Sequence, residues 1–263
     1  HNHHTLGGGL MSLKDRVALV TGASRGIGAA TAEVLARRGA QVALSARTVS
    51  DLEQVSARIR SAGGRALVVP CDVLDPAQVD AMIGAVVKEW GRLDILVNNA
   101  GMGTPTMPVE TISPTDWDTA VALNLKSVFL AIRAVVPVMK SQKSGRIVNV
   151  SSFAGRNFSR TSGPQYSAAK AGILGLTKHM AVELGPFGIC VNSVAPSIVL
   201  TARVKAKWEA RPPEEQRAIL AALPLRRLAM PEEVATVIAF LASDDASYVN
   251  GVCIDINGGS YMV

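Results

Sequence analysis

The sequence has few cysteines, no long apolar run and no cluster of basic residues, and each lack excludes a class of protein. The three cysteines, Cys71, Cys190 and Cys253, are far apart and have neither disulfide nor zinc-ligand spacing. We expect small core residues in a reducing, cytoplasmic compartment and no metal site. No apolar run reaches the roughly 18 residues that span a bilayer, and the apolar core of a signal peptide is missing. The sequence therefore predicts no membrane partner.

Basic residues are in excess, but they are scattered. The formal net charge is +6, and acidic residues separate the basic ones along the chain. Nucleic-acid-binding proteins gather their basic residues on one face, helix or ribbon, so the pattern favours a solvated surface and no nucleic-acid partner. With 48% hydrophobic and 18% charged residues, the composition is typical of a soluble globular protein.

The first ten residues, HNHHTLGGGL, combine three histidines with a glycine-rich spacer. They are typical of an affinity-tag and linker remnant, with a native histidine-rich metal tract as the alternative. Residues 11–263 contain no linker-like segment and no internal repeat, which predicts a single domain.

Short apolar runs alternate with amphipathic stretches from residue 16 onward. The expected strands are residues 16–21, 41–45, 66–71, 94–98, 146–151, 189–194 and 252–256. Proline or acidic residues mark helix starts after Asp75, Ser113 and Met230. Strands that alternate with helices pair in parallel through right-handed crossovers. The sequence predicts an α/β fold, a doubly wound Rossmann-type domain with a seven-stranded parallel sheet and helices on both faces. A (β/α)₈ barrel would need an eighth strand.

A glycine-rich segment, TGASRGIG at residues 21–28, lies between the first expected strand and the first expected helix. Glycines at this turn let the backbone approach a pyrophosphate, which binds at the helix N-terminus. The spacing of Gly22, Gly26 and Gly28 differs from the G-x-G-x-x-G of ordinary dinucleotide folds. The turn indicates a phosphate site, and a tight turn with close helix–sheet packing is the alternative.

Three further segments carry a family resemblance. Residues 98–101 (NNAG) follow the fourth expected strand, Ser151-Ser152 ends the fifth, and Tyr166 and Lys170 lie one turn apart on the next helix. Together with the glycine turn, they resemble the short-chain dehydrogenase/reductases over about residues 13–261. The chain is similar to bacterial 3-oxoacyl-(acyl-carrier-protein) reductase-like members. The resemblance implies an oxidoreductase that transfers hydride between a nicotinamide and a carbonyl or secondary alcohol.

The resemblance also assigns roles. Tyr166 would exchange the proton as general acid or base, Lys170 would lower the tyrosine pKa and hold the nicotinamide ribose, and Ser152 would polarise the substrate oxygen. Asn124 matches the family's asparagine in a proton relay through water. The cofactor contacts implied in this way are Gly22, Ser24, Arg25, Gly26, Ile27, Gly28, Arg47, Asp72, Val73, Asn99, Ala100, Gly101, Tyr166, Lys170, Pro196 and Thr201.

The end of the second expected strand bears on the choice of cofactor. NAD sites usually hold an acid there for the adenosine ribose hydroxyls, and this sequence has Ala46. Arg25 and Arg47 could both face the 2′-phosphate of NADP, which suits a guanidinium. We expect NADP(H) to be preferred over NAD(H); the alternative is two exposed arginines without this role.

The substrate is less well defined by the sequence. By resemblance, residues 197–225 form a lid, whose apolar side chains either line the site or pack the lid onto the body. Pro196-Ser197 departs from the family's Pro-Gly. Bacterial relatives use two basic positions beside the mouth of the site for an acidic acyl carrier protein. Lys143 retains one and Phe187 replaces the other. A 3-oxoacyl group on an acyl carrier protein therefore stays one candidate substrate, and sugar, steroid or small aliphatic ketones are the others.

Two further expectations concern assembly and the class of protein. Residues 117–140 and 164–184 are apolar on more faces than one contact with a sheet requires, and the resemblance makes them the interface of a homotetramer. A catalytically silent NADP-binding sensor or scaffold is the alternative of another class. Such a protein would be expected to lose Tyr166, Lys170 or Ser152, and all three are present.

Overall fold

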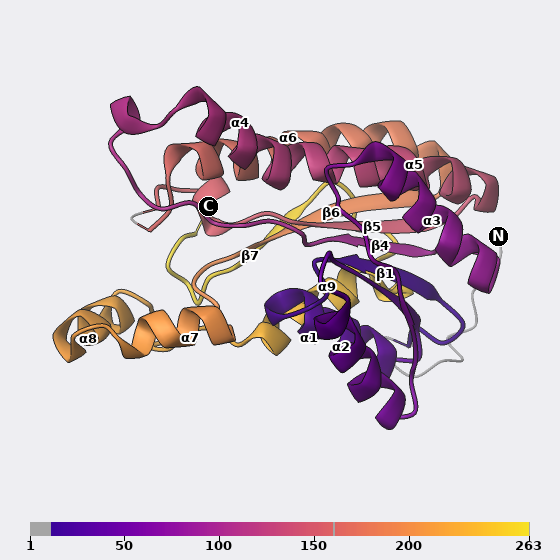
Figure 1. Ribbon diagram of the computed structural model, residues 1–263, viewed down its shortest axis with the longest axis horizontal. Helices are drawn as coiled ribbons and strands as arrows, with labels where there is room; N and C mark the ends of the chain where they lie inside the picture. The colour runs from indigo at the N-terminus through magenta and orange to yellow at the C-terminus, as the bar shows by residue number, and fades with distance from the viewer. Residues whose placement is uncertain (1–11, 160, 263) are drawn as a thin grey trace.

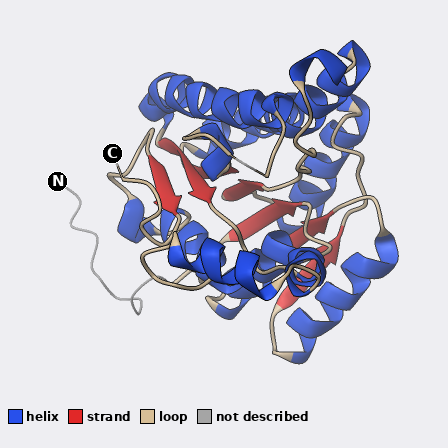
Figure 2. Ribbon diagram, turned by 90° about the vertical axis from the view of Figure 1, so that its left-hand side faces the viewer, coloured by secondary structure: helices blue, strands red, loops and turns tan. Residues whose placement is uncertain are grey.

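The computed structural model describes residues 12–159 and 161–262, and these form one seven-stranded parallel sheet between two layers of helices (Figures 1 and 2). The strands are β1 (Val17–Thr21), β2 (Gln41–Ser45), β3 (Arg65–Val68), β4 (Ile95–Asn98), β5 (Gly145–Val150), β6 (Ile189–Pro196) and β7 (Cys253–Ile256). Their order in the sheet is β3-β2-β1-β4-β5-β6-β7. The predicted doubly wound fold is confirmed. The expected tag at residues 1–10 lies outside the described residues.

The five central strands bury both of their faces, whereas the edge strands β3 and β7 are half-buried or exposed, and successive side chains of a central strand enter different cores. Ala18 and Val20 of β1 join the core under one helical layer, and Val17 and Leu19 join the core under the other. The first layer holds α1 (Gly26–Arg37), α2 (Val49–Ser61) and α9 (Pro231–Leu241). The second holds α3 (Pro76–Trp90), α4 (Pro114–Val121), α5 (Ser127–Gln142) and α6 (Pro164–Leu184). This double burial explains why the strands appear in the sequence as continuous apolar runs.

The three helix starts marked in the sequence are confirmed. Asp75 Oδ1 accepts hydrogen bonds from the backbone N–H groups of Ala77 (2.9 Å) and Gln78 (3.3 Å) at the start of α3. Ser113 Oγ accepts from the backbone of the third residue of α4. At α9 a Glu233 carboxylate oxygen accepts from the backbone N–H of Met230 at 2.8 Å. These side chains satisfy backbone donors that a helix start would otherwise leave open.

Two expectations about the body of the fold need correction. The third strand ends at Val68 rather than at residue 71, although the backbone N–H groups of Val69 and Cys71 still donate to the carbonyls of Leu44 (2.9 Å) and Ala46 (3.1 Å). Cys71 is buried as expected, but Cys190 and Cys253 are only half-buried.

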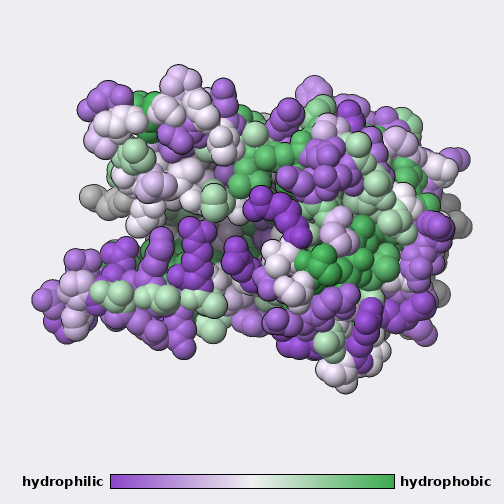
Figure 3. Space-filling model, viewed as in Figure 1, coloured by the Kyte–Doolittle hydropathy of each residue, from purple (hydrophilic) through white to green (hydrophobic). Residues whose placement is uncertain are grey.

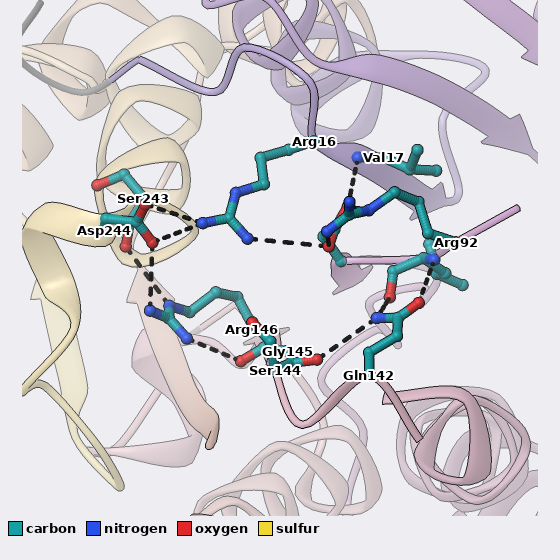
Figure 4. A network of polar contacts seen from close by, with 11 residues as sticks. Arg16, Val17, Arg92, Gln142, Ser144, Gly145, Arg146, Ser243 and Asp244 are labelled. Carbon is teal, nitrogen blue, oxygen red and sulfur yellow. Dashed lines mark hydrogen bonds and ion pairs between the residues drawn. The ribbon is translucent and has the colours of Figure 1, made fainter. Parts of the chain in front are cut away.

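A charged cluster joins the strand ends at the amino-terminal edge of the sheet (Figure 4). The Asp94 carboxylate is 2% exposed and accepts hydrogen bonds from the backbone N–H of Val17 (2.9 Å) and from Arg92 (2.9 and 2.7 Å). Arg16 lies 3.8 Å from the same carboxylate and pairs with Asp244 at 2.8 Å. The cluster holds β1 to β4 at the edge opposite the strands' carboxyl ends.

One helical stretch, Pro114–Gln142, is long and apolar enough by length and composition to cross a membrane. It joins α4, a π-helical turn η2 (Ala122–Lys126) and α5. The interruptions Lys126 and Arg133 keep it from being a continuous apolar run in the sequence. In the structure α5 packs on β4, β5 and α3, and Val135 is among its fully buried residues.

The expected lid contains two short helices, α7 (Ala202–Glu209) and α8 (Pro213–Ala221). They project from the body as an arm (orange in Figure 1), and every residue of both helices is exposed or half-buried. A hollow separates this arm from the mass above it in the space-filling view (Figure 3). The lid therefore packs onto the body through residues outside its two helices, such as the buried Val199 before α7.

Candidate active site

The four expected catalytic residues come from three separate parts of the chain and meet at the carboxyl ends of β4 and β5. Ser152 lies two residues after the end of β5 and caps the start of the short helix η3 (Phe153–Gly155). Tyr166 and Lys170 lie in the first two turns of α6, and Asn124 lies in the π-helical turn η2. Ligands bind at this edge of parallel sheets.

The Tyr166 phenol lies near the Ser152 side chain, close enough for the serine hydroxyl to act on the pKa of the phenol. The Ser152 Oγ also accepts from the backbone N–H of Ala154 at 3.1 Å, which fixes the serine rotamer. Burial of the phenol raises the pKa of Tyr166, and the Ser152 hydroxyl opposes this rise. The pair places two hydroxyls where one carbonyl oxygen could contact both.

Lys170 is 4% exposed, and its Nζ donates to the backbone carbonyl of Val150 at 2.8 Å. Burial lowers the pKa of Lys170 to about 8. The ammonium lies 5.7 Å from the centroid of the Tyr166 ring. The ammonium is bonded to a carbonyl and desolvation dominates the pKa of the phenol, so the expected effect of Lys170 on the tyrosine pKa stays a prediction.

Asn124 anchors the loop that follows β4. Its Oδ1 accepts from the backbone N–H of Met102 at 3.0 Å, and its Nδ2 donates to the carbonyls of Met102 (3.1 Å) and Ala120 (3.0 Å). A Cβ on Gly101 would lie 2.7 Å from Asn124 Oδ1 and 3.3 Å from Lys170 Nζ. Only glycine fits there, and this contact places Asn124 and Lys170 together against the same side of Gly101.

The glycine turn before α1 has the shape of an anion cradle. Gly22 and Gly26 have φ values of 65° and 57°, a region that favours glycine. A Cβ on Gly28 would lie 2.1 Å from the carbonyl oxygen of Gly22. Arg25 occupies the N-cap position, and its side chain has no acceptor atom that could cap the amides of the first turn. These amides and the helix dipole fit a pyrophosphate.

The residues expected at the adenosine end of the cofactor, and the start of the lid, lie at the same edge of the sheet as this turn. Arg25 and Arg47 are exposed, Ala46 is half-buried, and Asp72 Oδ1 accepts from the backbone N–H of Leu74 at 3.0 Å. A Cβ on Gly26 would lie 3.1 Å from the Thr201 side chain, so the start of the lid touches the start of α1. The structure brings the other expected cofactor residues to the same edge: Ser24, Ile27, Val73, Asn99, Ala100 and Pro196.

Lys143, which was expected beside the mouth of the site, lies at a different edge of the sheet. Lys143 lies two residues before β5, whereas Ser152 lies two residues after it, so Lys143 lies at the opposite edge of the sheet from Tyr166 in the same chain. Phe187, near the end of α6, has the Lys140 ammonium 4.3 Å from its ring centroid. The expectation that Lys143 lies beside the mouth of the site is wrong for a single chain.

Sequence reasoning missed an ion pair next to Ser152. The Arg156 guanidinium donates to both carboxylate oxygens of Asp255 in β7, at 3.1 and 3.0 Å. It lies 5.9 Å from the centroid of the Tyr261 ring, which also packs edge-on against Phe153 at 6.2 Å. The pair ties the segment after Ser152 to the last strand. The partners are 99 residues apart, and such a distance leaves no local pattern.

Comparisons with known proteins find relatives over nearly the whole chain. A family model described as enoyl-(acyl carrier protein) reductase matches residues 22–261. The 3-oxoacyl-(acyl-carrier-protein) reductase of Vibrio cholerae is 41% identical over 254 residues, covering 96% of this chain and 100% of the relative. Levodione reductase of Leifsonia aquatica is 39% identical, covering 93% of this chain and 94% of the relative. A short-chain type dehydrogenase/reductase from Mycobacterium marinum has a TM-score of 0.89 at 35% identity, covering 97% of this chain and 98% of that one.

Proposed function

This chain belongs to the short-chain dehydrogenase/reductase family of oxidoreductases, and we propose that it is an NADP(H)-dependent reductase of ketones with Tyr166 as general acid. The observation that carries this proposal is the meeting of Ser152, Tyr166 and the buried Lys170, whose Nζ lies 5.7 Å from the centroid of the Tyr166 ring, at the carboxyl end of β5. The bound cofactor would supply the hydride. The alternative of a silent sensor or scaffold has less support, because it needs none of these side chains.

Each side chain has a separate task in this proposal. The Ser152 and Tyr166 hydroxyls bind the carbonyl oxygen, and Tyr166 delivers its proton as negative charge develops there. Lys170, an ammonium below its pKa of about 8, favours the phenolate left behind and holds ribose hydroxyls. Asn124 fixes the Met102 backbone, and a water near it would return the proton from solvent.

The first prediction tests the function and the cofactor together. NADPH should be oxidised with ketones and should bind more tightly than NADH, because Arg25 and Arg47 are free to meet a 2′-phosphate beside Ala46. Charge-assisted hydrogen bonds contribute roughly 1.5–3 kcal/mol, so NADPH should bind at least about tenfold more tightly. The measurement is the dissociation constant of each reduced cofactor by fluorescence titration, followed by cofactor absorbance with a panel of ketones.

Substitutions then assign the preference to these residues. The double change Ala46→Asp with Arg47→Ser should reverse the order of the two affinities. Arg37→Ser, an exposed arginine at the other end of α1, is the matched control and should leave the order unchanged. Equal affinities of the parent protein for both cofactors would refute the proposed preference.

We propose a small-molecule ketone with an apolar part as substrate. Met102 and Phe158, on loops that leave the site, are 50% and 75% exposed and offer an apolar surface. A 3-oxoacyl group on an acyl carrier protein is the second candidate, favoured by the 41% identity to a reductase of that name. Within one chain the distant Lys143 and the aromatic Phe187 favour the small ketone.

We further propose a cytoplasmic enzyme with no nucleic-acid or membrane partner.

The second prediction concerns assembly. A shallow apolar groove runs between α5 and α6, lined by Val121, Leu125, Lys126, Phe129, Gly172, Gly175, Leu176 and His179. Phe129 in this groove is 49% exposed. We propose that the face carrying it is an interface of a homotetramer, since large exposed apolar patches mark such contacts. Light scattering should give four times the mass of one chain.

A charge in the groove should break this assembly. Phe129→Glu would bury an unpaired carboxylate in the interface, so the variant should run as a smaller species at the same micromolar concentration. Val109→Glu is the control, because Val109 is 71% exposed in the short helix η1 (Val109–Thr111), outside the groove. A monomeric parent protein would contradict the proposal.

A further inference from the structure

The C-terminal segment, residues 255–261, contacts both the lid and the residues that follow Ser152. Figure 1 shows this end of the chain between the arm and the helices above it. Residues 255–261 have no part in the hydride and proton transfer proposed for this site. Their contacts nevertheless join two separate parts of it, the substrate lid and the loop of the catalytic serine.

Both ends of the lid are hydrogen-bonded to this segment. At the start of the lid, the backbone N–H of Ser197 donates to the carbonyl of Ile256 at 3.0 Å. At its end, the backbone N–H of Leu225 donates to the carbonyl of Gly258 at 3.2 Å. The position of the lid at its base therefore depends on where the C-terminal segment lies.

The segment has a fixed shape because it folds back on itself. Gly258 and Gly259 have φ values of 62° and 83°, a region that favours glycine. Asn257 Oδ1 accepts from the backbone N–H of Gly259, and its Nδ2 donates to the carbonyl of Tyr261, both at 2.9 Å. A Cβ on Gly259 would lie 3.1 Å from the ring of Pro224 in the lid. A displacement of Tyr261 would therefore move this turn against the end of the lid.

The end of the segment packs on residues that directly follow Ser152. The Tyr261 ring lies edge-on to Phe153, with 6.2 Å between the ring centroids. The guanidinium carbon of Arg156 lies 5.9 Å from the Tyr261 ring centroid, and this guanidinium donates to both carboxylate oxygens of Asp255. One aromatic contact and one ion pair therefore hold η3 and the residue after it to the segment.

The short helix η3 is also packed on α6. A Cβ on Gly155 would lie 2.6 Å from the carbonyl carbon of Lys170, and Ser151 Oγ donates to the same carbonyl group at 2.7 Å. The Ser152 hydroxyl accepts from the backbone N–H of Ala154 within η3. The direction of this hydroxyl therefore follows the position of η3, which α6 and the C-terminal segment fix together.

We propose that the C-terminal segment couples the lid to Ser152, and that Tyr261 and the pair Arg156–Asp255 are positioning residues for this serine. The proposal rests on the proposed ketone reductase function, in which the Ser152 hydroxyl binds the carbonyl oxygen. Tyr261 acts through η3 rather than on the substrate. When the lid moves, the segment moves with it and changes the direction of the serine hydroxyl.

A double-mutant cycle tests whether Tyr261 acts through Ser152. Tyr261→Ala removes the contacts with Phe153 and Arg156 and should lower kcat with the best ketone by about tenfold, because small misplacements of a reacting group are costly. The NADPH dissociation constant should not change. In the Ser152→Ala protein the same change should lower kcat by less than about twofold, since the positioned group is gone. An equal loss in both backgrounds, or none in the parent, would overturn the proposal and leave the ketone reductase intact.

Three variants support the assignment. Tyr261→Phe keeps the ring and should keep the parental kcat. Met262→Ala is the matched control, because the neighbouring Met262 is 81% exposed, and it should also keep the parental kcat. Asp255→Asn keeps the volume but weakens the ion pair, so it should lower kcat in the parent and not in the Ser152→Ala protein. A Tyr261→Phe variant as slow as Tyr261→Ala would overturn the positioning role of the ring.

Amide hydrogen exchange tests the coupling without turnover. Tyr261→Ala should speed exchange in peptides covering residues 152–157 and 223–227, because the segment holds both. A peptide from α2 is the internal control and should exchange at the parental rate. Parental exchange in either of the two site peptides would overturn the coupling. If the parent reduces no ketone of the panel, the proposed function fails, and this measurement still decides whether the segment joins the lid to the serine loop.

Discussion

Replacing Tyr166 by phenylalanine should lower kcat for ketone reduction by about 10²–10⁴-fold, the usual contribution of general acid catalysis. The change removes one hydroxyl and keeps the ring and the helix. That hydroxyl lies near Ser152, so the variant loses the proton donor and half of the pair proposed to bind the carbonyl oxygen. The measurement is steady-state kinetics with the best ketone of the panel, with the NADPH dissociation constant determined in parallel.

The controls separate chemistry from structure. NADPH affinity should change little in Tyr166→Phe, because the ribose contact is assigned to Lys170. Ser152→Ala should also lower kcat with cofactor binding preserved. Tyr248→Phe is the matched control, since Tyr248 is fully exposed, and it should keep parental rates. A Tyr166→Phe variant with a near-parental kcat would show that the carbonyl oxygen takes its proton from another group.

The architecture was predictable because parallel strands buried on both faces leave a strong pattern. Runs such as residues 16–21 have no polar face, and proline or acidic residues mark the helices between them. Boundaries were less predictable at the edge of the sheet. β3 ends at Val68 although Val69 and Cys71 are apolar and still donate backbone hydrogen bonds to Leu44 and Ala46. A local pattern shows the residue types but not where the regular pairing of two strands stops.

The candidate site was predictable where it depends on spacing along one element. Tyr166 and Lys170 share a helix face, and the glycines of the first turn adjoin one helix start. The sequence does not show what a side chain contacts across the fold. The bond from Lys170 to the Val150 carbonyl therefore has no signal in the sequence, and neither has the burial of Gln165. Lys143 was misplaced because a strand separates it from the site.

Replacing Lys170 by methionine should abolish most activity and at the same time stabilise the protein at neutral pH. We expect kcat to fall by about 100-fold or more and NADPH affinity to fall with it, because one ammonium serves both the phenol and the ribose. Lys170 is 4% exposed, and burial lowers its pKa from 10.5 to about 8. The folded state therefore holds the ammonium at a cost on the order of 3 kcal/mol. Methionine fills a similar volume without a charge to desolvate.

The pH dependence of unfolding decides whether that cost is real. Between pH 8 and 10.5 the unfolded chain keeps the Lys170 proton while the folded chain loses it, so parent stability rises with pH over this window. Below pH 8 both states are protonated and the full cost remains. The Lys170→Met variant lacks this titration. Its advantage in free energy of unfolding should be largest at pH 7 and should shrink toward pH 10, as measured by urea unfolding at matched concentrations. A variant less stable than the parent at pH 7 would mean that the bond to the Val150 carbonyl outweighs desolvation, and that Lys170 supports the fold as well as the reaction.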